Sequence, residues 1–162
     1  METATQPGLL VKMILMAWDA QNNYLKKLIS SLTDEQLTKE IAAGKNTGVY
    51  LLGHLIAVSD GMLPLLGFGD RLFPEMEEVF IKNPDKSGRA FPSVAELKQR
   101  LEAVNTKLNS HFKSTDIDGW LGRHTAVSSE DFIKEPHRNK LNVVINRTGH
   151  MAYHIGQMRL IN

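Results

Sequence analysis

The segment from Thr47 to Leu63 constrains the fold most, because it is apolar on nearly every side (VYLLGHLIAVSDGML from Val49 onward). A helix that is hydrophobic all round is expected to be buried on most of its faces. This segment therefore needs other helices around it. We expect it to end at Pro64, which cannot continue a helix, with Gly67 soon after.

Three further segments carry apolar residues at the three- and four-residue steps of a helix. The first is followed by Thr33 and Gln36, and the second is preceded by Ser93 and Glu96; both pairs predict a capping box. The last segment runs from about residue 139 to residue 161. The periodic positions of the first two are Leu10, Ile14, Trp18, Gln21, Leu25, Leu28 and Leu32, and Val94, Leu97, Leu101, Val104, Leu108 and Phe112.

A long connection, residues 67–92, separates the second and third helices along the chain. Loops of more than about 15 residues are uncommon unless they are functional or carry local helix, and residues 75–81 predict one such turn. In the irregular stretch 114–137 we expect Trp120 and Phe132 to pack over one end of the helices. Strand alternation is absent. The sequence therefore predicts one all-α domain over residues 1–162, a four-helix bundle with a long loop between helices 2 and 3.

Composition excludes several classes of partner. Lys and Arg total 19 against 18 Asp and Glu, whereas proteins held by nucleic-acid phosphates usually carry a basic surplus. The apolar stretch Gly8–Trp18 is interrupted by Lys12 and lacks a cleavage site, so it indicates a helix face, and no run is long enough to span a membrane. We expect a cytoplasmic protein that binds neither nucleic acid nor membrane. The chain has no cysteine, so any metal ion must be held by nitrogen and oxygen ligands.

The chemistry concentrates in the last helix, at GHMAYHIGQMRLI. His150 and His154 are four residues apart and share one stripe, so their rings are placed to bind one ion. The most apolar stripe, which includes Val144, Met151 and Ile155, is rotated by roughly 80–100° from the histidines. The histidines therefore border the core, where an open cavity has room.

His54 lies inside the most apolar helix, where an imidazole without a partner costs on the order of 1–3 kcal/mol. Three histidines without cysteine match the donor set of a catalytic zinc or nickel site that keeps an open position. The residues alone leave two interpretations open. His54, His150 and His154 either hold one metal ion or make ordinary hydrogen bonds, for His54 to a buried carbonyl.

Three other side chains are candidates for supporting or substrate-binding roles. Tyr50 precedes His54 by one turn, and either lines the metal cavity or is an ordinary core tyrosine. Arg147 adjoins the histidine stripe and either binds a substrate carboxylate or pairs with an acid such as Asp60. Gln157 flanks the stripe, where its amide is placed to hydrogen-bond a ligand ring.

These residues resemble the DinB/YfiT-like superfamily of metalloproteins, which are four-helix bundles. In that family a histidine of the second helix, usually followed by Leu or Ile, joins a C-terminal HxxxHxGQ motif. Here these are His54 with Leu55, and HMAYHIGQ. The resemblance implies that His54, His150 and His154 are metal ligands. Many members have a further histidine where this chain has Asn146, which we do not count as a ligand.

Relatives in that family include thiol-dependent S-transferases and a mycothiol-dependent isomerase. The resemblance therefore implies a zinc or nickel enzyme that uses a low-molecular-weight thiol and a small-molecule substrate. A metal-dependent hydrolase, and a non-enzymatic stress-response or ligand-binding bundle with a structural metal, are the alternatives. Family members are often dimers, and the first helix has apolar residues beyond its core stripe, which predict a homodimer contact. They are Leu9, Val11, Met13, Leu15 and Met16.

Overall fold

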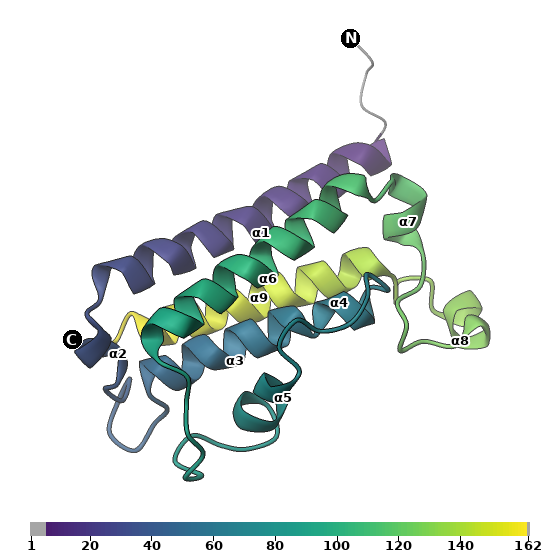
Figure 1. Cartoon of the computed structure of the whole chain (residues 1–162). Coiled ribbons are helices and arrows are strands. Elements are labelled where there is room, and N and C mark those ends of the chain that lie inside the picture. The colour runs from purple at the N-terminus through teal and green to yellow at the C-terminus, as the bar shows by residue number, and fades with distance from the viewer. Residues whose placement is uncertain (1–5, 162) are drawn as a thin grey trace.

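Four long helices form the bundle that the sequence predicts (Figure 1). The structure is a computed structural model that describes residues 6–161. Within that range it contains no strand, only isolated bridges between Glu40 and Thr47 and between Arg123 and Asn139. The long helices are α1 (Gln6–Ser31), α3 (Gly48–Asp60), α6 (Val94–Ser114) and α9 (Lys140–Met158). The short ones are α2 (Asp34–Leu37), α4 (Met62–Leu65), α5 (Glu75–Phe80), α7 (Ile117–Leu121) and α8 (Ser129–Lys134).

The order of packing around the bundle is α1 on α9, α9 on α3, and α3 on α6. α5, from the long connection, lies against α3 (Figure 1). α1 and α6 meet through side chains: the rings of Trp18 and Phe112 are 6.1 Å apart, and Lys26 pairs with Glu102 at 2.6 Å. The metal-site candidates on α3 and α9 therefore lie on adjacent helices.

α3 is buried on most of its surface, as its composition predicts. The apolar stretch Gly48–Leu65 is long enough to cross a membrane, but 72% of it is buried inside the bundle, which is typical of a core helix. Both predicted capping boxes are present, at Thr33 with Gln36 and at Ser93 with Glu96.

Pro64 does not end the second helix, contrary to the prediction. α3 stops at Asp60, and the proline lies inside the following turn, α4. The buried Asp60 carboxylate accepts hydrogen bonds from the backbone N–H groups of Leu72 (2.8 Å) and Phe73 (3.0 Å). These bonds tie the start of the long connection to the end of α3.

The core stripe of α1 agrees with the prediction at Trp18 and Leu25 and differs by one residue elsewhere, where Val11, Asn22 and Ile29 are buried in place of Leu10, Gln21 and Leu28. Val11 is buried and Leu10 is 58% exposed, because apolar residues occupy both positions and periodicity does not distinguish them. Val11 is therefore a core residue and not part of an outer face. Trp120 packs against Phe112 over the bundle end as expected, whereas Phe132, on α8, is only half-buried and lies outside the core.

Candidate metal centre

Three histidine side chains converge between α3 and α9. His150 Nε2 lies 3.3 Å from His54 Nε2 and 3.1 Å from His154 Nε2. One ligand atom from each of the three lies within 4.8 Å of the others. His150 and His154 meet because they are four residues apart on α9, and His54 approaches from the adjacent helix. The structure thus brings together the three ligands predicted from the sequence.

Hydrogen bonds at Nδ1, the ring nitrogen that lies away from the other histidines, orient the rings of His54 and His154. His54 Nδ1 lies 2.8 Å from the Phe80 carbonyl oxygen, which can only accept, so Nδ1 carries the proton. His154 Nδ1 donates to Gln157 Oε1 at 2.7 Å, and the Gln157 amide group donates in turn to the Tyr153 hydroxyl. In neutral His54 and His154 the Nε2 lone pairs therefore face the centre of the cluster.

The surroundings favour neutral imidazoles. Burial, together with smaller contributions from His154, His54 and Arg147, lowers the pKa of His150 to about 4. Burial also lowers the pKa of His154, although the hydrogen bond to Gln157 opposes the shift. A neutral imidazole is the form that binds a metal ion.

The donor set fits a tetrahedral first-row metal ion. At Zn–N distances of about 2.0–2.1 Å, two ligand nitrogens at a tetrahedral angle are about 3.3–3.4 Å apart. The observed separations of 3.3 and 3.1 Å are close to that value. Without an ion, Nε2–H of His150 can donate to Nε2 of His54 or of His154, whereas a cation would accept the lone pairs of all three nitrogens once His150 carries its proton on Nδ1. Three imidazoles would leave a fourth position open.

A row of contacts fixes the face of α3 that carries His54. Thr47 donates to the Asp85 carboxylate through its backbone N–H and its hydroxyl, and the Tyr50 hydroxyl donates to the Asn83 carbonyl at 2.8 Å. His54 contacts the Phe80 carbonyl on the same side. Residues 80–85 thus run beside α3 and hold His54 in place. Tyr50 stacks on the His54 ring at 6.4 Å and anchors this segment, and it is not among the residues that line the adjoining cavity.

A cavity of about 540 Å³ adjoins His54 and His150. Its other lining residues are Val58, Gly61, Pro64, Leu65, Arg71, Ile81, Thr125 and Arg147. Burial lowers the pKa of Arg147, and its buried Nε has no hydrogen-bond partner. The pairing of Arg147 with Asp60 is wrong, because the Asp60 carboxylate bonds to backbone N–H groups, and Arg147 has no ion pair within residues 6–161. A half-buried cation without an ion pair in that range therefore lines the cavity.

Sequence reasoning missed the Phe80 carbonyl and Arg71. The Phe80 carbonyl is a backbone group that no side-chain pattern marks. Arg71 lies over Gly61, where an added Cβ would be 2.9 Å from its Nη2, and it donates to the Ala57 carbonyl. The glycine at the end of α3 is the one sequence signal of this close approach.

Comparison with known proteins agrees with the fold. A crystal structure of a conserved protein from Enterococcus faecalis has the same fold, with a TM-score of 0.62, 13% identity, and coverage of 93% of this chain and 95% of that one. A search of curated protein sequences gives no match. The sequence profile of the DinB superfamily matches residues 17–158, which include all three converging histidines. Because the profile match covers most of its length, the chain belongs to the DinB superfamily.

Proposed function

We propose that this protein is a metal-dependent transferase that joins a low-molecular-weight thiol to a small electrophile, with zinc or nickel held by His54, His150 and His154. The observation that carries the proposal is the convergence of three imidazoles in a chain without cysteine. Three neutral ligands leave the full charge of a divalent ion uncompensated. When bound, such an ion makes a coordinated thiol markedly more acidic. Because the chain has no thiol of its own, the thiol has to be a cosubstrate.

The protein's own groups have separate tasks in this proposal. The Phe80 carbonyl and Gln157 hold the rings of His54 and His154 in the orientation that a metal ion needs. The apolar part of the cavity, including Val58, Leu65 and Ile81, accommodates the body of the electrophile and excludes water from it.

Arg147 supports an electrophile that carries a carboxylate. Its guanidinium is half-buried and lacks an anion, and a substrate carboxylate in the cavity would supply one with bidentate geometry. Loss of such a contact raises KM, whereas the metal content stays unchanged.

The proposal is tested with protein loaded with Co²⁺. Addition of small thiols such as cysteine or glutathione is expected to give an intense near-ultraviolet thiolate-to-metal charge-transfer band. A His150→Ala, His154→Ala double variant is expected to lose both metal and band. His137→Ala, which removes an exposed histidine, serves as the matched control and is expected to keep both.

Two outcomes would refute the proposal. Turnover of added esters or amides without any effect of thiols on the spectrum would show a hydrolase. A fully coordinated ion that neither thiols nor water reach would show a structural metal, as in a stress-response or ligand-binding bundle.

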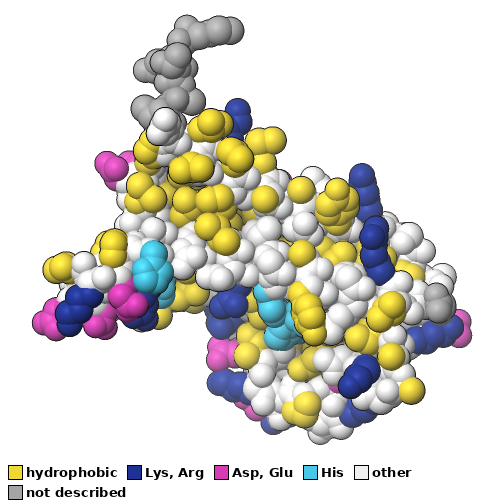
Figure 2. All heavy atoms as spheres, turned by 180° about the vertical axis from the view of Figure 1, so that it is seen from behind, with side chains coloured by type: hydrophobic (Ala, Val, Ile, Leu, Met, Phe, Trp, Pro, Cys, Tyr) yellow, Lys and Arg dark blue, Asp and Glu magenta, His cyan; other side chains and the backbone are white. Residues whose placement is uncertain are grey.

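We also propose that the protein is a homodimer. Leu9, Met13 and Met16 are each at least half exposed on α1, as expected, and Leu10 joins them, whereas Leu15 is half-buried. Figure 2 shows hydrophobic side chains gathered over the end of the molecule where α1 begins. Adjacent exposed apolar residues of this kind are typical of a subunit contact.

A further inference from the structure

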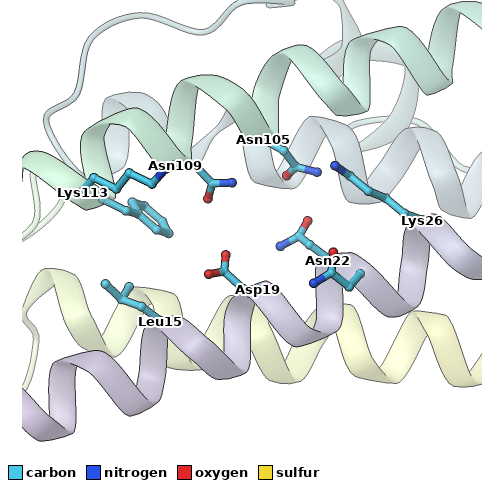
Figure 3. A pocket seen from close by; sticks show the side chains of 9 residues that line it. Leu15, Asp19, Asn22, Lys26, Asn105, Asn109 and Lys113 are labelled. Carbon is cyan, nitrogen blue, oxygen red and sulfur yellow. The ribbon is translucent and has the colours of Figure 1, made fainter.

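A second cavity, of about 340 Å³, opens between α1 and α6 and shares no residue with the metal centre (Figure 3). Its lining is rich in amides and contains only two apolar side chains. The lining residues are Leu15, Asp19, Asn22, Asn23, Lys26, Asn105, Asn109, Phe112 and Lys113. We call it the α1–α6 pocket. Figure 3 shows side chains of both helices pointing into the gap between them.

Two buried asparagines leave hydrogen-bonding groups unused in this pocket. Asn105 is 4% exposed, and neither its Nδ2 nor its Oδ1 has a hydrogen-bond partner among residues 6–161. Asn22 is 8% exposed; its Nδ2 donates to the Trp18 carbonyl, whereas its Oδ1 has no partner. Buried amides of proteins are almost always hydrogen-bonded, because an unpaired one destabilises the fold. Unpaired amide groups that face a cavity indicate that a molecule bound in the cavity forms the missing hydrogen bonds.

The charges around the pocket cancel. Lys26 pairs with Glu102. Asp19 and Lys113, of opposite charge, are exposed at the mouth, and neither has an ion pair within residues 6–161. The buried groups are neutral amides that both donate and accept. A charged ligand group at Asn105 would be desolvated without a counter-charge, so the pocket suits a neutral molecule.

We propose that the α1–α6 pocket binds a neutral polyhydroxylated small molecule of about monosaccharide size. Each hydroxyl group donates and accepts, as the amides of Asn105 and Asn109 do. The buried ring of Phe112 provides an apolar surface for the C–H face of such a ligand. The volume is near the lower end of the range for small-molecule sites, roughly 300–1,000 Å³.

The test uses the full chain and a panel of D-glucose, D-galactose, D-mannose and myo-inositol at up to 10 mM. Saturation-transfer-difference NMR reports binding, and the fluorescence of Trp18 and Trp120, which both pack against Phe112, reports occupancy of this pocket. At least one member is expected to bind saturably. Glycine betaine and glutamine, which are zwitterions, are expected not to bind.

Asn105→Leu is the decisive variant, because leucine has the same number and branching of side-chain heavy atoms as asparagine and no polar group. We expect it to abolish binding and to raise Tm of the ligand-free protein by about 2–4 °C, since it removes the unpaired amide. Asn146→Leu, at an exposed position of α9, is the matched control. Its change in Tm measures how much of the effect comes from the higher helix propensity of leucine, and it is expected to keep ligand binding. Asn109→Ala, at the half-buried edge, is a second variant that keeps the core intact and is expected to weaken binding about tenfold, since it removes one amide.

Three results would overturn the proposal. They are no saturable signal from any polyol, binding that persists in Asn105→Leu, and binding of the zwitterions in place of the sugars. A crystal structure with 10 mM of the panel that shows only ordered water on Asn22 and Asn105 would overturn it as well. None of these results depends on metal content, so the pocket and the metal centre are tested separately.

Discussion

Replacing Gly53 by alanine tests how tightly the metal centre is built into the core. A Cβ at this position would lie 2.2 Å from Phe80 Cε1 and 2.4 Å from Phe80 Cζ. The Phe80 ring is fully buried and packs against Tyr50 at 5.8 Å and Phe91 at 5.1 Å, so it cannot rotate away. Phe80 therefore has to shift together with the residues that pack around it.

Two opposing effects set the magnitude. Alanine in place of glycine inside a helix raises the free energy of unfolding by about 0.5–1 kcal/mol. Overpacking of a well-packed core costs about 1–3 kcal/mol. The expected result is a net loss of about 1–2 kcal/mol, equivalent to a fall in Tm of about 2–8 °C. Because the Phe80 carbonyl holds His54, we also expect a loss of about 10–100-fold in metal affinity.

Urea unfolding of the metal-free protein measures the first effect, and competition with a chromogenic chelator measures the second. Gly156→Ala is the control: this glycine is also inside a long helix, but nothing lies within 4 Å of its added Cβ. It should stabilise the protein by about 0.5–1 kcal/mol. If Gly53→Ala stabilises the protein as much as Gly156→Ala does, the Phe80 ring yields freely and the argument for a rigid clamp on His54 is refuted.

Chelation is expected to lower Tm but to leave helical circular dichroism unchanged, because the core contains no metal ligand; unfolding in chelator would contradict this. The metal-free protein should lose stability as pH falls from about 6.5 to about 4, because unfolded His150 binds a proton throughout that window and folded His150, with a pKa of about 4, does not. A Tm independent of pH in that window would contradict it. Tyr50→Phe should cost about 1 kcal/mol by removing the hydroxyl bond to Asn83 while keeping one metal ion per chain; loss of the metal would mean that Tyr50 does more than anchor. Sedimentation at tens of micromolar should show a dimer that Met13→Lys converts to a monomer, and a wild-type monomer would contradict the proposed contact.

The helices could be predicted because their signals are local. Capping boxes specify the starts of α2 and α6, and the three- and four-residue apolar steps specify the buried face of α6. The residue at which α3 ends could not be predicted from such local signals. α3 ends at Asp60 because its carboxylate bonds to backbone groups of the long connection, a tertiary contact that overrides the expected break at Pro64.

The three converging histidines were predictable because two share a helix stripe and the third interrupts an apolar helix. The groups that hold the histidine rings in place were harder to predict from the sequence. Gln157 forms the expected hydrogen bond with His154, since it is three residues away on the same helix. The Phe80 carbonyl, 26 residues from His54, is set by the path of the long connection. The choice between Asp60 and a substrate as the partner of Arg147 likewise depended on tertiary contacts.

The bundle places its two cavities on different helix pairs, which has a consequence for how they act on each other. The metal centre lies between α3 and α9, and the α1–α6 pocket lies between the other two long helices. α1 packs on α9, and α6 packs on α3, so a ligand in either cavity can affect the other only through these two helix contacts. Energetic coupling requires an element with two arrangements, and close packing holds each of these helices in one. We therefore expect the metal affinity to be the same with and without a polyol bound, to within the error of a chelator competition. A shift of more than about threefold would show that one of these helix contacts rearranges.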